Sequence, residues 1–255
     1  MIFTVVGALI IGLSLGLLGS GGSILTVPLL TYVIGEPAKV AIAESLIIVG
    51  CIALVGAINS QRKGVIAWPL VLSFGLPSMG GTYIGAWASQ FVSGLVQLAV
   101  FAIIMLLASR FMLKPVQIQQ EQKSSSVLGT FAAGVVVGAI AGFVGVGGGF
   151  LIVPALLIVG GITMSMAIGT SLSIIFLQSS VGFAKYYYLF SQQTEYQINF
   201  TLVAIMATIG ALGSLLGSKI GGSLPQQKLK QIFGILLIVM GIGIFTSSLW
   251  QIINA

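Results

Sequence analysis

The sequence predicts an all-α membrane protein made of two repeats that cross the bilayer in opposite directions. Hydrophobic residues make up 57% of its 255 residues and charged residues only 5%, whereas a soluble chain carries about 25% charge. A glycine-rich stretch occurs twice, and the positive charges gather between alternate apolar segments. With so few charges the chain cannot cover a water-facing surface, so its solvent is lipid.

The apolar segments fall into two sets of five, and the second segment of each set is short. A helix needs about 20 apolar residues to cross a bilayer core. We expect segments at 3–18, 23–34, 38–60, 65–89, 92–113, 127–144, 149–160, 164–187, 198–219 and 230–253. Residues 1–113 then form the first transmembrane repeat, 114–126 a cytoplasmic linker and 127–255 the second repeat. Each repeat is a glycine-broken hairpin followed by three transmembrane helices.

The repeat is most evident in residues 18–28 and 144–154, which are 126 positions apart and identical at six of eleven positions. A GxxxG pair precedes each stretch, at Gly12 and Gly16 and at Gly138 and Gly142. Such spacing lets two helix backbones approach closely in lipid. A cluster of glycines followed by a proline inside an apolar segment predicts a broken helix. Breaks at matching positions of two halves indicate a transporter's binding site.

The distribution of lysine and arginine favours inverted halves. If each break joins a helix to a short segment that returns to the same side, the ten positive residues divide 8 to 2 across the membrane. If each broken segment is a single crossing, the halves run parallel and the division is 6 to 4. The positive-inside rule favours the first arrangement. In the plasma membrane, both termini then lie outside and the 114–126 linker lies in the cytoplasm.

The breaks are candidate anion sites because a helix that starts at a break presents unpaired N–H groups and the positive end of its dipole. Glycine also lets the backbone itself approach a ligand. The residues expected to bind substrate here are Gly21, Gly22, Ser23, Gly147, Gly148 and Gly149. The alternative is that these glycines only permit tight helix packing.

Four further polar residues are candidates for substrate binding. Ser45 and Ser171 occupy equivalent repeat positions, and Thr170 precedes Ser171. Their hydroxyls could complete an anion shell, or they could bond back to their own helix. Gln178 is expected to line the pathway, with helix–helix hydrogen bonding as the alternative.

Glu44 is the candidate for proton coupling. It lies inside an apolar stretch, and its repeat partner is Thr170. An ionisable group in a membrane helix costs about 2.5–3.5 kcal/mol on insertion scales and is therefore functional by default. We expect Glu44 to carry a proton during anion movement. The alternative is that Glu44 lies near the outer interface and pairs with Lys39.

The sequence provides poorly for catalysis. It has no histidine and a single cysteine, so the usual metal and general-base chemistry is missing and no metal or cofactor is expected. No GxxxxGK[ST] motif is present, and ATP coupling would need another chain. Positive residues lie between apolar segments, where a bias that sets membrane orientation explains them better than binding of nucleic acid. We expect a protein that is not an enzyme.

The chain resembles the TauE/SafE family of sulfite-exporter-like permeases, also called the toluene sulfonate uptake permease family. The resemblance covers essentially the whole chain and rests on Gly19–Pro28, Gly145–Pro154 and Gly169–Leu172. It implies transport of small anions such as sulfite, sulfoacetate and related sulfonates. The first stretch departs from the three-glycine form at Ser23, which adds a hydroxyl donor.

Together these features predict a secondary transporter that moves a small anion, sulfite or an organosulfonate, by alternating access, with protons as a possible coupling ion. Its partners are then the anionic substrate and the lipid bilayer. Two alternatives remain at this stage: an anion channel of the same architecture, and a membrane scaffold without transport.

Overall fold

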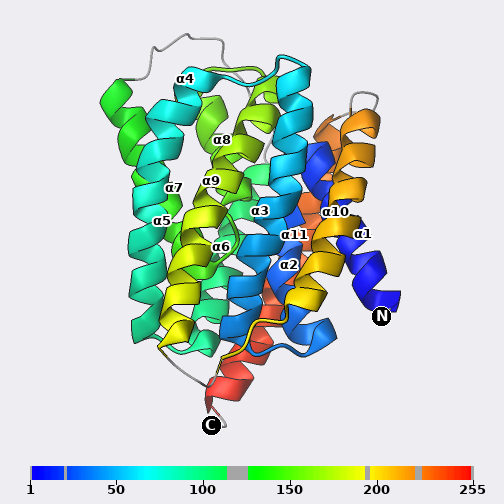
Figure 1. Ribbon diagram of the computed structural model, residues 1–255, viewed down its shortest axis with the longest axis vertical. Coiled ribbons are helices and arrows are strands. Elements are labelled where there is room, and N and C mark those ends of the chain that lie inside the picture. The colour runs from blue at the N-terminus through cyan, green and yellow to red at the C-terminus, as the bar shows by residue number, and fades with distance from the viewer. Residues whose placement is uncertain (1, 20–21, 114–125, 193–195, 222–225, 254–255) are drawn as a thin grey trace.

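The computed structural model describes residues 2–19, 22–113, 126–192, 196–221 and 226–253. The α-helices run over Ile2–Leu18 (α1), Gly22–Pro28 (α2), Ala38–Arg62 (α3), Trp68–Leu70 (α4), Leu76–Ala88 (α5), Gly94–Leu113 (α6), Val127–Val144 (α7), Gly149–Gly160 (α8), Met164–Ser191 (α9), Phe200–Ile220 (α10) and Gln226–Ile253 (α11). Two π-helices occupy Leu29–Ile34 (η1) and Val71–Gly75 (η2), and a 3-10 turn occupies Ser89–Phe91 (η3). No β-strand occurs among these described residues, as expected for an all-α protein (Figure 1).

Each of the ten expected segments corresponds to a helix or to a run of short helices. Helices α3, α7, α9 and α10 are long and apolar enough to cross a membrane. Shorter apolar helices include α1, α8 and the combined run of α2 and η1. Length and composition therefore agree with a membrane-integral chain.

Proline accounts for two changes of helix geometry. Pro28 closes α2, and the chain continues as the π-helix η1. Pro77 stands in the first turn of α5, directly after the π-helix η2. Proline has no backbone N–H and clashes with the preceding turn, so a regular α-helix cannot pass through it unchanged. The expected segment 65–89 is accordingly divided into α4, η2, α5 and the start of η3.

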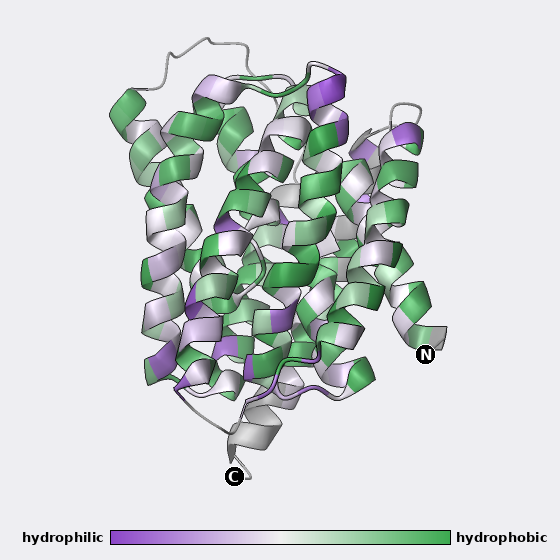
Figure 2. Cartoon of the chain, in the orientation of Figure 1, coloured by the Kyte–Doolittle hydropathy of each residue, from purple (hydrophilic) through white to green (hydrophobic). Residues whose placement is uncertain are grey.

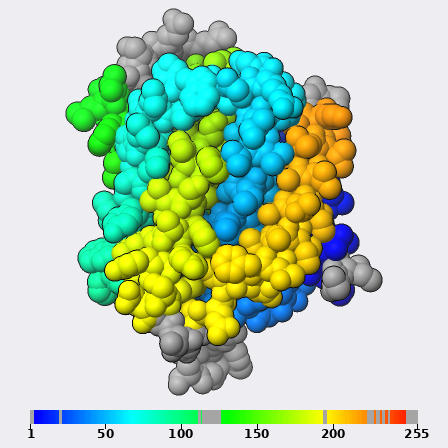
Figure 3. Space-filling view, in the orientation of Figure 1, coloured from blue at the N-terminus to red at the C-terminus, as the bar shows by residue number. Residues whose placement is uncertain are grey.

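Helices α3 and α9 pack against each other at the centre of the molecule (Figure 1). Helix α10 packs on α3, and α5 packs on α9. The first helix of each half packs on the other half, α1 on α10 and α7 on α5, while α6 pairs with α11. Helices α3, α9 and α10 also run side by side across the face shown in Figure 3. Each of these named pairings thus has a counterpart when the halves are exchanged.

The broken helices form hairpins. In Figure 1, α1 starts at the lower end and the loop after η1 lies at the lower end again, whereas α7 begins and α8 ends at the upper end. Both termini lie at the lower end. We call the upper end, where α3 finishes and α9 begins, the Lys63 end.

The GxxxG glycines are used within the chain, between the halves. A Cβ atom on Gly16 of α1 would lie 2.9 Å from the Cα of Ser214 in α10. A Cβ on Gly142 of α7 would likewise lie 2.8 Å from the Cα of Thr82 in α5. Carbon atoms pack best about 3.5–4.0 Å apart. These two helix pairs can therefore only reach their observed separation with glycine at the contact.

The outer surface of the bundle is largely apolar. Apolar residues extend along the helices in Figure 2, and exposed large examples include Phe3, Leu72, Ile158 and Val239. A soluble monomer rarely exposes apolar patches of more than a few hundred Å². A lipid-facing surface explains these side chains.

Candidate functional site

Both glycine-rich stretches interrupt a helix, the first between α1 and α2 and the second between α7 and α8. Gly19 and Gly145 follow α1 and α7 with φ values of 67° and 74°, and Gly147 and Gly148 have φ values of 63° and 62°. Glycine adopts this left-handed conformation without the penalty that a Cβ atom brings. Gly21, also expected to bind substrate, lies outside the described residues.

The residues after each break differ in their surroundings. Gly22 packs against α1, where a Cβ atom would overlap the carbonyl oxygen of Ile11. Ser23 beside it is fully buried. Gly149 begins α8, whose N-cap residue Gly148 makes no side-chain capping bond. Gly22 therefore permits close packing of α2 on α1. The N-terminus of α8 differs because its N-cap residue is a glycine, which has no side chain to cap the first turn.

Each break is tied to the opposite half by one serine. The Ser171 hydroxyl lies 2.8 Å from the Gly19 carbonyl oxygen, and the Ser45 hydroxyl bonds the Gly145 carbonyl oxygen. Each hydroxyl is also 2.8 Å from a carbonyl oxygen one turn back in its own helix. A hydroxyl has one proton to share between two such acceptors. Both serines thus bond back to their own helix, and both also hold the end of α1 or α7 in place.

Glu44 and Thr170 make equivalent contacts in the two halves. Glu44 Oε1 accepts a hydrogen bond from the backbone N–H of Asn199 at 2.7 Å, and Thr170 Oγ1 accepts one from Ala67 N–H at 2.9 Å. Asn199 and Ala67 are the N-cap residues of α10 and α4. Glu44 is fully buried, and its Oε2 has no hydrogen-bond partner among the described residues.

Unpaired polar atoms lie beside the second break. Gln178 is fully buried, and neither atom of its amide has a hydrogen-bond partner among the described residues. A Cβ atom on Gly148 would lie 3.0 Å from Gln178 Oε1, and one on Gly147 would lie 3.0 Å from the hydroxyl oxygen of Ser179. The Ser179 hydroxyl is also buried, with no partner in the part of the chain that the structure describes. A buried polar group without a partner costs about 1–3 kcal/mol, which marks this position as one suited to a ligand or a water molecule.

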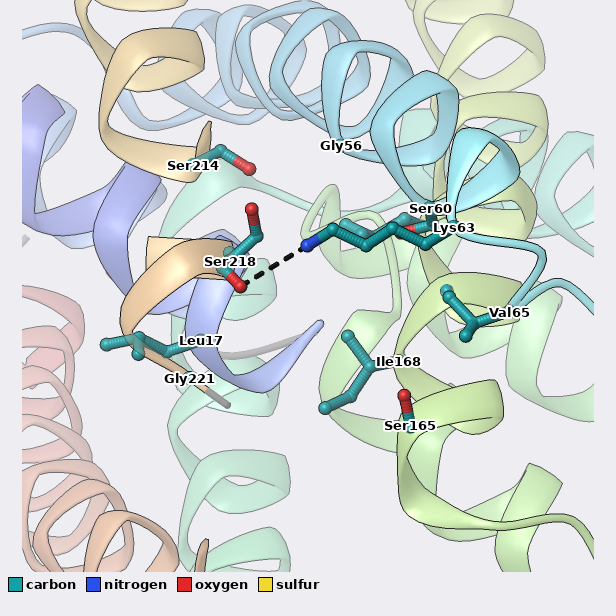
Figure 4. A pocket seen from close by; sticks show the side chains of 13 residues that line it. Leu17, Gly56, Ser60, Lys63, Val65, Ser165, Ile168, Ser214, Ser218 and Gly221 are labelled. Carbon is teal, nitrogen blue, oxygen red and sulfur yellow. Dashed lines mark hydrogen bonds between the residues drawn. The ribbon is translucent and has the colours of Figure 1, made fainter. Parts of the chain in front are cut away.

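A polar pocket of about 190 Å³ opens among α1, α3, α9 and α10. Its lining, shown in Figure 4, consists of Gly16, Leu17, Gly56, Ser60, Lys63, Val65, Ser165, Ile168, Gly169, Leu172, Ser214, Ser218 and Gly221. We call it the Lys63 pocket. Lys63 reaches across it, and its Nζ atom lies 3.5 Å from the Ser218 carbonyl oxygen.

The chemistry of the Lys63 pocket suits an anion. Lys63 is the only ionisable side chain among the described lining residues. Ser60, Ser165, Ser214 and Ser218 supply hydroxyls, and the Ser214 hydroxyl is buried without a partner among the described residues. The first turn of α9 also lines the pocket, and the positive end of a helix dipole favours negative charge. An ammonium group with several hydroxyl donors can replace the water that a small anion loses on binding.

The pocket borders the first break but contains none of the residues expected to bind substrate. Gly16 and Leu17 lie in the last turn of α1, immediately before Gly19. Gly169 and Leu172 line the pocket on either side of Thr170 and Ser171. Thr170 and Ser171 are therefore sequence neighbours of lining residues, whereas the described break residues and Gln178 are not among the residues that line the pocket.

Sequence reasoning missed the pocket-lining lysine and serines. Lys63 was counted only among the ten positive residues whose distribution indicates the orientation. Gly56, Ser60 and Lys63 are spaced four and three residues apart in sequence, and Ser214, Ser218 and Gly221 have the same spacing. Residues three and four apart share one face of a helix. Polar faces of this kind on two apolar segments would have been a signal for the pocket.

A second, apolar pocket of about 490 Å³ lies on α3, α4 and α9. Its lining is mostly aliphatic and aromatic, with Arg62 and Gln61 among the polar residues. Such a lining suits a hydrocarbon chain better than a small anion. The Lys63 pocket is therefore the stronger candidate for a polar substrate.

The fold and the pocket indicate an integral membrane protein of the all-helical class, with paired helix breaks and a polar cavity between its halves. The chain belongs to the sulfite exporter TauE/SafE family, whose sequence profile matches residues 4–244.

Curated relatives carry transporter names. A probable membrane transporter protein of Xylella fastidiosa is 30% identical, and the match covers 97% of this chain and 96% of that protein. Proteins with the same description occur in Methanocaldococcus jannaschii, at 26% identity over 92% of each chain, and in Bacillus subtilis, at 28% identity over 94% of this chain and 95% of that one. No solved structure matches the chain significantly. The names point to a membrane transporter rather than an enzyme.

Proposed function

We propose that the chain is a secondary transporter that moves a small anion, sulfite or an organosulfonate, across the plasma membrane by alternating access. The observation that carries this proposal is the Lys63 pocket, where one ammonium group and four serine hydroxyls meet with no acidic residue among the described lining residues. The family description names a sulfite exporter, and this supports a sulfur oxyanion as the substrate class.

The alternating-access part of the proposal rests on a relation between the halves as inverted repeats. Three observations support it: the matching glycine stretches, the reciprocal packing of α1 on α10 and α7 on α5, and the hairpins that point from opposite ends. Alternating access in such folds works by rocking one repeat against the other around a central site.

The orientation that we propose places the Lys63 end in the cytoplasm. The 8 to 2 division of positive residues supports it, because Arg62, Lys63 and Lys219 gather at that end. Both termini and the loop before α10 then lie outside. In this orientation the Lys63 pocket opens to the cytoplasm.

Proton coupling is assigned in this proposal to Glu44. Its carboxyl group is buried, holds the N-cap of α10 through one oxygen and has no partner among the described residues on the other. A proton gained or lost there changes a contact between the two halves directly. Protonation of Glu44 could in this way be coupled to a movement of one half against the other.

The experiment is uptake of radiolabelled sulfite by proteoliposomes, with and without an imposed proton gradient. We expect saturable uptake, and we expect Lys63→Gln to reduce it by about tenfold or more, since a hydrogen bond to a charged group is worth roughly 1.5–3 kcal/mol. Lys219→Gln is the matched control, because Lys219 lies at the same end of the molecule but does not line the pocket. Uptake that rises linearly with sulfite concentration would favour a channel. Equal uptake by Lys63→Gln and Lys219→Gln would contradict the Lys63 pocket as the binding site.

A further inference from the structure

One face of α9 connects the Lys63 pocket with the opposite end of the molecule. Ser165, Gly169 and Leu172 line the pocket. Continuing at helical spacing, the same face carries Ser179, beside the second break, and then Tyr186. Residues three and four apart stack along one side of a helix. A substrate that leaves the pocket for the opposite end would follow this face and meet Tyr186.

Tyr186 stands where the other half has a pocket-lining serine. The 126-residue offset of the repeat relates Ser60 to Tyr186 and Gly16 to Gly142. On the Lys63 side, the small residues leave an open cavity. On the other side, Tyr186 is among the largest fully buried side chains of the described residues and is 1% exposed.

Hydrogen bonds hold the Tyr186 hydroxyl at the end of α7. The hydroxyl oxygen lies 3.3 Å from the carbonyl oxygen of Gly142 and 3.2 Å from that of Phe143. It accepts a bond of 3.0 Å from Gln97 Nε2, which also donates to Phe143 O at 2.7 Å. All of these partners are neutral, so water or a ligand can replace them without separating charges.

The space around Tyr186 retains polar groups that its own contacts do not satisfy. Gln97 is fully buried, and its Oε1 has no hydrogen-bond partner among the described residues. Ser89 is buried beside the Tyr186 hydroxyl. It lies 132 positions before Gly221 of the Lys63 pocket, the spacing that also separates Gly81 from Gly213 in this later part of the repeat. Lys39 stands at the repeat position of Ser165. The counterpart region thus has hydroxyls and an amide of its own, and the repeat relation assigns it a cation in the first turn of α3.

We infer that the chain has a second pocket for the same small anion at the end opposite to the Lys63 pocket, and that Tyr186 closes it in this state. Withdrawal of the ring from the Gly142 and Phe143 carbonyls opens the counterpart pocket to the opposite side of the membrane. This inference rests on the proposed function for the identity of the ligand. The closure by Tyr186 rests instead on the burial of its ring and on the hydrogen-bond contacts of its hydroxyl with Gly142, Phe143 and Gln97.

The test uses thiol accessibility, which requires no transport. The native Cys51 is first replaced by serine, and single cysteines are then introduced as Ser60→Cys in the open pocket or Ser89→Cys in the closed one. The purified protein is treated with a small, water-soluble methanethiosulfonate. We expect Ser60→Cys to react readily and Ser89→Cys to react slowly.

Removal of the gate should expose the closed pocket. With Tyr186→Ala, the reaction rate of Ser89→Cys should rise by about tenfold or more, because the open minor state of a two-state protein is commonly populated at about 0.1–10%. Tyr186→Phe keeps the ring and should raise the rate less. If Tyr186→Ala does not fold, Gln97→Ala removes one of the bonds to the hydroxyl and should still raise the rate. An unchanged rate in the folded variants would overturn the gate.

Sulfite protection separates this inference from the proposed function. Sulfite should slow the labelling of Ser60→Cys, and it should slow that of Ser89→Cys when combined with Tyr186→Ala. Protection of the first cysteine alone would overturn the second anion pocket while leaving the proposed function in place. If sulfite protects neither cysteine, sulfite binding in both pockets is contradicted. A faster labelling reaction of Ser89→Cys in the presence of Tyr186→Ala would still support Tyr186 as the gate.

Discussion

Substitution of Gly142 by alanine should destabilise the protein through one contact between its halves. Gly142 of α7 lies against α5, where a Cβ atom would stand 2.8 Å from Thr82 Cα and overlap the Thr82 carbonyl oxygen. Since carbon atoms pack best about 3.5–4.0 Å apart, the helices would have to separate by roughly 1 Å. Overpacking of this kind costs about 1–3 kcal/mol. We therefore expect Gly142→Ala to lower the melting temperature by roughly 2–12 °C, at about 2–4 °C per kcal/mol.

Gly129→Ala is the matched control because Gly129 lies in the same helix, and a Cβ atom there would have nothing within 4 Å. Alanine is favoured over glycine inside a helix by about 0.5–1 kcal/mol, so this variant should be as stable as the wild type or more so. Thermal unfolding of the two purified variants in one detergent, followed by tryptophan fluorescence, gives the comparison. Equal melting temperatures would refute the argument that glycine sets the approach of α7 to α5.

Three further predictions concern the buried polar residues. Ser171→Ala should cost about 0.5–1.5 kcal/mol by removing the bond across to the first break, whereas Ser180→Ala, which loses only a bond within its own exposed turn, should not change the melting temperature. Glu44→Gln keeps an acceptor for the α10 N-cap but cannot ionise, so sulfite uptake should lose its pH dependence. A Glu44→Gln profile that matches the wild type would remove the coupling role. Gln178→Leu should leave the ligand-free protein as stable or more stable, since its amide has no partner among the described residues, while lowering the uptake rate; unchanged uptake would exclude Gln178 from the pathway.

The sequence was sufficient to predict the helical segments and the breaks. Apolar composition limits the chain to membrane helices, and glycine clusters at matched positions mark where a helix must stop. Helices α3 and α9 begin at the residues expected for them, and α7 and α8 agree at both ends. The division of 65–89 was missed because it depends on how one proline, Pro77, is accommodated by the turn before it.

The polar contacts were predicted less completely because their partners lie far apart in the chain. Ser171 and Gly19 are 152 residues apart, and Glu44 and Asn199 are 155 apart. The alternative considered for the serines, bonding back to their own helix, identified their bonds to the preceding turn but not the bonds to the other half. Lys39 was a plausible partner for Glu44 by proximity in sequence, whereas in the fold Glu44 Oε1 bonds the backbone of the loop before α10.

The Lys63 pocket was not predicted because four helices from both halves build it. No single segment contains its chemistry, and Lys63 by itself is equally well explained as an orientation signal. Helical periodicity can identify a polar face on α3 and on α10, but it does not say that the two faces meet. That information comes only from the packing of α10 on α3, with α1 and α9 completing the lining.

The most direct test of the central claim is thermal stabilisation of the purified protein by a panel of anions: sulfite, thiosulfate, sulfate, sulfoacetate and taurine. A ligand at about 100 times its Kd stabilises the folded state by about 2.7 kcal/mol. We predict that at least one sulfur oxyanion raises the melting temperature of the wild type and of Lys219→Gln, and that Lys63→Gln abolishes the effect. Stabilisation that survives Lys63→Gln, or its absence with every anion in the wild type, would contradict an anion site in the Lys63 pocket.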